Sequence, residues 1–294
     1  MSQVVSESQK MNSQKVPKRV VVVGCNGFIG KALVNELARL GISYLGLPKE
    51  EFNLLDKVTS DKLNKILNAD DQVVFTSAIA PSKVADDVIK SITMAETFCK
   101  SIEKLSVKQV ILISSDSVYG DRSGVFTEES SCYPNSFHGL AQLSREIIFT
   151  SSTVKNLAIL RVCAVYGPGD THNGYGPNRF VNQIKNLESI KIFGEGLNLR
   201  DHIFIDDVVS LIIESLKINL FGKLNIVSGR SYSFLEVANM CKNIFSPNST
   251  IDNLGSEGEI IEKYFKNDKV YDLFPKFVLH DLESGLNLWK SRLL

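Results

Sequence analysis

The stretch VVVVGCNGFIG, residues 20–30, decides the fold. Four β-branched residues in a row suit a parallel strand that is covered on both faces. Three glycines follow at intervals of three, at Gly24, Gly27 and Gly30. Over residues 29–40 the apolar side chains then recur at almost every fourth position, which is typical of one face of a helix. The stretch therefore predicts a strand, a glycine turn and a helix in direct succession.

Each glycine has its own task in this context. Gly24 permits the tight turn, Gly27 lets the backbone approach a pyrophosphate, and Gly30 allows the helix to pack closely on the strand. The N–H groups and the dipole of the helix stabilise the phosphate charge. We therefore predict a dinucleotide site formed by Gly24, Gly27, Phe28, Ile29 and Gly30. The alternative is a turn whose glycines serve packing alone, and the strand–turn–helix context favours the site.

The alternation of strands and helices continues along the chain. Apolar runs predict further strands at residues 42–47, 72–75, 110–113 and 157–162, and a helical face extends over 84–105. This order predicts an α/β fold, a doubly wound parallel sheet of Rossmann type with helices on both faces. We expect a disordered tail at 1–17 and a dinucleotide-binding Rossmann domain at 18–165. Residues 166–294 should form mainly a smaller C-terminal substrate-binding lobe, with some segments returning to the Rossmann core.

Composition argues against several classes of protein. The 294 residues have a formal net charge of zero, which gives no overall bias toward nucleic acid or a membrane surface. No apolar run approaches the roughly 20 residues that span a bilayer, and the first residues lack the apolar stretch of a signal peptide. The five scattered cysteines show neither metal-ligand spacing nor a disulfide framework. We predict a cytoplasmic protein without a metal site.

Three later segments carry a specific resemblance. SSDSVYG at 114–120, LRVCAVYGPGD at 160–170 and RDHIFIDDV at 200–208 are similar to the patterns S-S-x-x-V-Y-G, L-R-x-x-x-V-Y-G-P and R-D-F-I-x-V-D-D-V. Together with the glycine loop they follow the order of the extended short-chain dehydrogenases/reductases. The chain resembles the nucleotide-sugar epimerases and dehydratases of that family, which implies a nicotinamide cofactor and a nucleotide-sugar substrate.

The resemblance implies roles for individual residues. Ser115 matches the active-site serine or threonine whose hydroxyl binds the reacting sugar oxygen. Arg200 matches an arginine that grips the nucleotide diphosphate with its planar donor fork, and the alternative is a surface ion pair. Asn178 and Arg179 lie near the position at which the family has a substrate-binding asparagine. Asn53 matches an aspartate that usually contacts the adenine.

Other positions depart from the family or leave the cofactor open. Ala164 stands where a substrate-binding asparagine is common, and residues 256–269 lack the usual second arginine. Lys49 favours the extra phosphate of NADP, whereas Glu50 or Glu51 favours the ribose hydroxyls of NAD. All three are equally compatible with solvated loop charges, so the cofactor is NAD or NADP.

The family's catalytic tyrosine and lysine are the main departure. The stretch PNSFHGLAQLSRE, 134–146, lines up with the pattern P-x-x-x-Y-G-x-S-K-x-x-x-E. The register is fixed by Pro134, Gly139 and Glu146. The resemblance therefore puts His138 at the tyrosine position and Gln142 at the lysine position.

This exchange leaves two hypotheses open. His138 and Gln142 lie one helical turn apart and share a face, so histidine could exchange the proton while the amide donates to ribose oxygens. The chain would then be an atypical epimerase, dehydratase or reductase of carbohydrate biosynthesis. Otherwise His138 only lines an inherited cleft, in a pseudoenzyme that binds NAD(P) or a nucleotide sugar for a regulatory or partner-binding role. The resemblance also implies a homodimer, and the apolar face of 84–105 is compatible with it.

Overall fold

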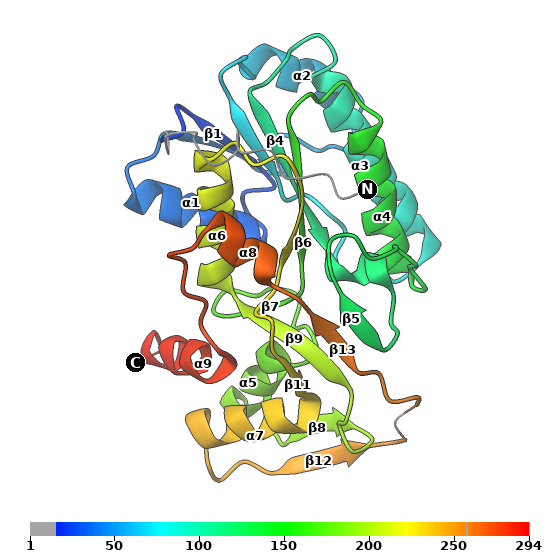
Figure 1. The fold of residues 1–294 in the computed structure, drawn as a ribbon, viewed down its shortest axis with the longest axis vertical. Helices are drawn as coiled ribbons and strands as arrows, with labels where there is room; N and C mark the ends of the chain where they lie inside the picture. Colours follow the sequence, from blue (N-terminus) through cyan, green and yellow to red (C-terminus); the bar gives the residue numbers. More distant parts are fainter. Residues whose placement is uncertain (1–15, 257, 294) are drawn as a thin grey trace.

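Six parallel strands form the central sheet in this computed structural model, which describes residues 16–256 and 258–293 (Figure 1). Most of the predicted tail, residues 1–15, lies outside the described residues. In spatial order the strands are β2 (Tyr44–Leu47), β1 (Val20–Val23), β3 (Gln72–Phe75), β4 (Gln109–Ser115), β6 (Leu157–Val162) and β10 (Gly222–Ile226). Neighbouring strands all pair in parallel. The predicted Rossmann-type sheet is therefore confirmed.

The valines of β1 explain why both faces of the sheet are covered. Val20 and Val22 face one hydrophobic core while Val21 and Val23 face the other, and all four are at most 1% exposed. The first core is covered by the helices α1 (Phe28–Arg39) and α6 (Ile205–Lys217). The second is covered by the helices α2 (Val58–Ile66), α3 (Ala85–Ser101) and α4 (Phe137–Thr150). The sheet thus lies between two helical layers.

A smaller lobe extends from the carboxyl end of the sheet (Figure 1). It contains the three-stranded sheet β7 (Ala164–Tyr166), β9 (Leu199–Phe204), β11 (Ser231–Ser233) and the pair β8 (Ile190–Phe193), β12 (Ile251–Leu254). Its helices are α5 (Pro177–Lys185), α7 (Phe234–Phe245) and α9 (Leu282–Ser291). The remaining elements are the 3-10 helix η2 (Asp116–Tyr119), the helix α8 (Asp268–Leu273) and the paired strands β5 (Gly124–Phe126) and β13 (Lys263–Phe265).

Two elements from the C-terminal half pack on the Rossmann core. Strand β10 pairs with β6 at the edge of the main sheet, and α6 packs against α1. Segments after residue 166 therefore return to the core, while the domain boundaries themselves stay a prediction.

A buried polar network ties together the motifs that the sequence suggested. Ser114 Oγ donates to Glu146 Oε1 over 2.6 Å, and Arg161 donates to both oxygens of the same carboxylate. Arg161 Nη1 also donates to the Tyr119 hydroxyl over 3.0 Å, and that hydroxyl donates to Asn225 Oδ1 over 2.7 Å. All five side chains are buried. Because buried charges require partners, this network fixes β4, η2, α4, β6 and β10 relative to one another.

Candidate active site

A cavity of about 670 Å³ lies between the central sheet and the smaller lobe. One wall is formed where strands end: Gly24 follows β1, Ser77 follows β3, Ser115 ends β4 and Cys163 follows β6. The carboxyl ends of parallel strands are where ligands bind in doubly wound folds. The opposite wall comes from the smaller lobe, including Phe234 of α7. The fold therefore brings the sequence motifs to one site.

The glycine loop forms the backbone cradle of this cavity. Its five predicted cofactor residues, Gly24 and 27–30, all line the cavity. Gly24 has a φ of +88°, and a Cβ there would lie 2.7 Å from Ser77 Oγ. A Cβ on Gly30 would lie 2.2 Å from the Gly24 carbonyl oxygen. Only glycine fits either position, so this loop suits the close approach of a pyrophosphate.

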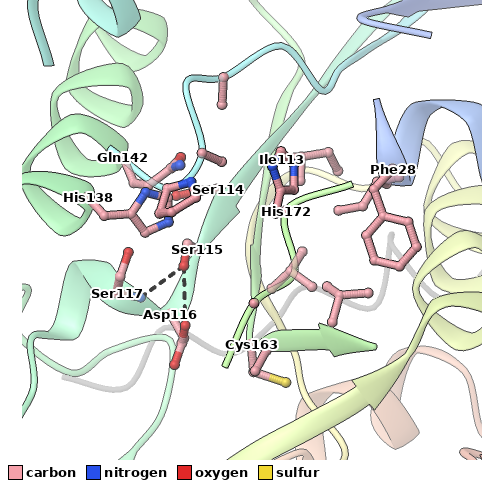
Figure 2. Close-up of a pocket in the computed structure, with 18 of the residues that line it drawn as sticks. Phe28, Ile113, Ser114, Ser115, Asp116, Ser117, His138, Gln142, Cys163 and His172 are labelled. Atoms are coloured by element: carbon pink, nitrogen blue, oxygen red, sulfur yellow. Dashed lines mark hydrogen bonds between the residues drawn. The ribbon is translucent and has the colours of Figure 1, made fainter. Parts of the chain in front are cut away.

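Ser115 is held at the start of η2. Its hydroxyl accepts a hydrogen bond from the Ser117 N–H at 3.1 Å and donates to Asp116 Oδ1 at 3.2 Å (Figure 2). The Asp116 carboxylate also pairs with Lys263 Nζ at 3.1 Å. These contacts place a carboxylate and a buried ammonium group beside Ser115, whose substrate role stays a prediction from the resemblance.

Helix α4 carries His138 and Gln142 into the same cavity. The Ser136 hydroxyl caps the helix by accepting from the Gly139 N–H at 3.1 Å. A Cβ on Gly139 would lie 2.4 Å from the Ser117 carbonyl oxygen, so α4 packs directly on the serine segment. Figure 2 shows His138 and Gln142 on the side where Ser115 lies, with Phe28 across the pocket.

The surroundings of His138 favour a neutral ring. Burial lowers the pKa of His138 below its usual 6.5, the Asp116 carboxylate opposes this, and Arg145 and His172 add to it. Ring Nδ1 accepts a hydrogen bond from the Ser82 N–H at 3.4 Å. This bond assigns the proton of the neutral imidazole to Nε2. With Nε2 protonated and Nδ1 engaged, the ring can take up a further proton only when Nδ1 releases the Ser82 N–H.

Of the predicted substrate residues, Arg200 and Asn178 line the cavity. Arg200 Nη2 pairs with Asp121 Oδ1 at 2.7 Å. Both polar atoms of the Asn178 side chain form hydrogen bonds with the backbone. Its Oδ1 accepts from the Gly167 N–H, and its Nδ2 donates to the Val165 carbonyl, both at 3.0 Å. Its substrate role stays a prediction.

Two other predicted residues do not line this cavity. The Arg179 guanidinium lies over the Tyr175 ring at 5.4 Å. Asn53 is exposed, and its Oδ1 accepts from the Leu55 N–H at 3.2 Å. Lys49 lines the cavity, whereas neither Glu50 nor Glu51 does.

Three charged residues near the cavity were not predicted from the sequence: Asp116, Lys263 and Arg145. Lys263 lies in the segment that lacks the family's second arginine, and its side chain is only 3% exposed. It is one of several lysines there, so only tertiary structure singles it out. Arg145 is different, because its spacing from His138 and Gln142 places all three on one helical face.

Two adjacent titratable groups, Asp201 and His202, also line the cavity. Burial lowers the pKa of His202 to about 4, and His202 Nδ1 lies 3.1 Å from the Arg200 carbonyl oxygen. Burial raises the pKa of Asp201 to about 6, although N–H groups of Ser228 and Gly229 donate to its carboxylate. Cys163 Sγ donates to the same carboxylate at 3.4 Å. All three side chains belong to the lining of the cavity.

Known proteins of one family match this chain. The sequence model of the NAD dependent epimerase/dehydratase family matches residues 20–225. The chain is 29% identical over 287 residues to the ADP-L-glycero-D-manno-heptose-6-epimerase of Brachyspira hyodysenteriae, covering 84% of this chain and 87% of that protein. It is 26% identical over 249 residues to a dTDP-4-dehydro-6-deoxyglucose reductase of Escherichia coli, covering 72% and 77%.

Solved structures show the same fold. The UDP-glucose 4-epimerase of Thermus thermophilus, complexed with NAD, has a TM-score of 0.81 at 18% identity, covering 93% of this chain and 98% of that one. The UDP-glucuronic acid 4-epimerase of Bacillus cereus, complexed with UDP-glucuronic acid and NAD, has a TM-score of 0.79 at 24% identity, covering 94% and 100%.

Proposed function

Because the chain belongs to the NAD dependent epimerase/dehydratase family, we propose that it catalyses an epimerase, dehydratase or keto-reductase reaction on a nucleotide-linked sugar. In this proposal His138 exchanges the substrate proton in place of the family's tyrosine, and Gln142 stands at the position of the lysine. The observation that carries the proposal is that His138, Gln142 and Ser115 line the same cavity as the glycine loop.

The residues divide the chemistry among them. A bound nicotinamide cofactor supplies hydride acceptance or donation at a sugar carbon. The glycine loop binds its diphosphate, and Ser115 holds the reacting sugar oxygen. His138 takes the proton from that oxygen at Nδ1, which must first release the Ser82 N–H, and returns it from the resulting imidazolium. We propose NAD as the cofactor, and the position of Lys49 makes NADP the comparison to test.

The uncharged amide of Gln142 favours a second candidate function. A site that binds the cofactor but lacks the charged member of the dyad would suit a pseudoenzyme with a regulatory or partner-binding role. Both candidates retain the glycine loop and Ser115, so ligand binding does not distinguish them. Turnover of a nucleotide sugar does.

The test is incubation with NAD(H) or NADP(H) and a panel of nucleotide sugars, with products identified by NMR. We expect an epimerised, dehydrated or reduced sugar, and a loss of about 10²–10⁴-fold in rate for His138→Ala. Thr150→Ala, at the other end of α4, is the control and should retain the rate. Cofactor binding without turnover of any sugar would favour the pseudoenzyme.

We also propose a homodimer that pairs α3 and α4 of two copies. These two helices pack against each other and leave apolar side chains uncovered. On α4, Phe137, Leu140 and Ile147 are 46%, 45% and 58% exposed, and on α3 Ile89 is 61% exposed. Adjacent exposed apolar side chains of this kind mark interaction surfaces.

A cytoplasmic location remains part of the proposal. All five cysteines are free thiols. Among the helices that the structure describes, none combines the length and the apolar character needed to cross a membrane. Fractionation of the cells that produce the protein would test the location.

A further inference from the structure

Arg145 on α4 is a fully buried cation with an unusual set of contacts. Its exposed fraction is 0%, and no carboxylate pairs with it among residues 16–256 and 258–293. Nη1 donates to Gln142 Oε1, and Nη2 donates to the Ser77 carbonyl at 2.9 Å. The guanidinium also lies over the Phe75 ring at 5.5 Å, while Nε lacks a hydrogen-bond partner within these ranges. The neighbouring Glu146 is engaged by Arg161.

A buried cation of this kind destabilises the folded state. Burying a charged group without an opposite charge is strongly unfavourable, because the group loses its hydration and gains no partner. Burial lowers the pKa of Arg145 to about 10, which still leaves it charged at pH 7. The only side chain that accepts a hydrogen bond from Arg145 in the described structure is Gln142, which lines the cavity.

The contact fixes the orientation of the Gln142 amide. A guanidinium has only donors, so the atom of Gln142 that faces it must be the carbonyl oxygen. The amide nitrogen then points away from Arg145 with its N–H groups available. A cation at the carbonyl end polarises the amide and strengthens its N–H groups as donors.

We propose that Arg145 is a positioning residue that acts through Gln142, giving the cavity the positive potential and the directed N–H that the family pattern obtains from lysine at position 142. His138, Gln142 and Arg145 share one face of α4 at the spacing i, i+4 and i+7. This inference rests on the proposed function, because the group that receives the N–H is taken to be a ribose hydroxyl of the nicotinamide cofactor.

The inference makes a lysine at position 142 and an arginine at position 145 mutually exclusive. Two buried cations on successive helical turns repel each other, so Gln142→Lys alone should destabilise the protein. Arg145→Met alone should leave the amide unoriented and weaken binding of NAD. The double variant restores one cation in the site and should bind NAD again.

The experiment measures the dissociation constant of NAD by calorimetry for the wild type, Arg145→Met, Gln142→Lys and the double variant. We expect about a 10-fold loss of affinity for Arg145→Met, as for a hydrogen bond to a charged group, and recovery to within about threefold in the double variant, while Gln142→Lys alone should unfold at a lower urea concentration. A structural role for Arg145 alone predicts additive losses. Equal affinity of Arg145→Met and the wild type would overturn the inference.

Gln142→Glu gives a second readout that does not depend on whether Arg145→Met folds. A carboxylate at position 142 would pair with Arg145 but has no N–H to offer. We expect unfolding at an equal or higher urea concentration, together with about 10-fold weaker NAD binding. Undiminished binding would contradict the inference.

The outcomes separate the two proposals. If the wild type binds neither NAD nor NADP, the cofactor role in the proposed function fails, and this role for Arg145 is refuted with it. If the wild type binds NAD and neither Arg145→Met nor Gln142→Glu weakens binding, the inference alone fails.

Discussion

The guanidinium of Arg161 binds both oxygens of the Glu146 carboxylate inside the core, with Nε at 3.0 Å from Oε1 and Nη2 at 2.7 Å from Oε2. Breaking such a pair from one side leaves a buried charge without its partner. We therefore expect Arg161→Met to lower the free energy of unfolding by about 3–5 kcal/mol, measured by urea denaturation. Arg39→Met, which removes an exposed pair with Glu36, should have a much smaller effect. Equal effects of the two variants would contradict the assigned role of the network.

Gly30→Ala tests the cradle of the glycine loop. The added methyl would meet the Gly24 carbonyl oxygen at 2.2 Å, so the turn or the helix must move. We expect a loss of about 1–3 kcal/mol in stability and at least a 10-fold weaker affinity for NAD, measured by denaturation and calorimetry. Gly258→Ala is the matched control because no atom of the described residues lies within 4 Å of its added Cβ. Unchanged NAD affinity in Gly30→Ala would place the cofactor elsewhere.

Arg200 and Asp121 should affect nucleotide binding in opposite directions. The ion pair between them occupies the donor fork that we assign to the diphosphate. Arg200→Met should weaken binding of UDP or ADP by about 10-fold. Asp121→Asn frees the guanidinium and should tighten binding by up to about fivefold, since this pair is partly exposed. If neither variant alters the calorimetric affinity, Arg200 is only a surface ion-pair partner.

His202 should make the protein less stable in acid. Its folded-state pKa of about 4 lies below the usual 6.5, so the unfolded chain binds the extra proton. This stability is fully present above pH 6.5 and is lost as the pH falls toward 4, by roughly 3 kcal/mol. His202→Phe should remove that part of the pH dependence in urea denaturation between pH 7 and pH 4.

Asp201 acts in the opposite direction over much of the same range. Its raised pKa contributes stability that is present below about pH 3.8 and is lost as the pH rises through about 6. Because Asp201 is present in both proteins, the difference between wild type and His202→Phe isolates the histidine. His172→Phe, at an exposed histidine, is the control. Parallel pH profiles for wild type and His202→Phe would refute the prediction.

Ile147→Asp should separate the proposed dimer. The side chain is 58% exposed on the apolar face of α4, and a charge there would be buried without a partner on association. Light scattering after size-exclusion chromatography should give a dimer mass for the wild type and a monomer mass for the variant. Val278→Asp, at an 82% exposed position outside α3 and α4, should remain dimeric. A monomeric wild type would exclude the interface.

Most of the fold could be predicted because its signals are local. The predicted strands at 20–23, 72–75 and 157–162 have the same bounds in the structure. Helix α3 ends at Ser101, whereas the apolar pattern suggested a helix as far as residue 105. The pattern continues past the helix because Ile102, just after its end, is also buried. Helix α2 was not predicted, since only Thr59 and Leu63 of its nine residues are buried and the periodic signal is weak.

The site was less predictable because it is assembled from distant segments. The glycine loop could be assigned since its residues are consecutive. The approach of Lys263 to Asp116 joins positions 147 residues apart, and no sequence spacing encodes it. The place of Arg145 could have been predicted from its helical spacing, although its charge lies three residues beyond the position where the family pattern has lysine.

The contact between Gly139 and the Ser117 carbonyl has a consequence for how new activities can arise on this scaffold. Backbone touches backbone there, so the distance between α4 and the serine segment does not depend on the side chains at positions 138 and 142. A substitution at either position therefore leaves the backbone of α4 at the same distance from the serine segment. Altered chemistry at position 138 can therefore arise without moving this backbone contact, whereas a change at position 142 must also suit Arg145.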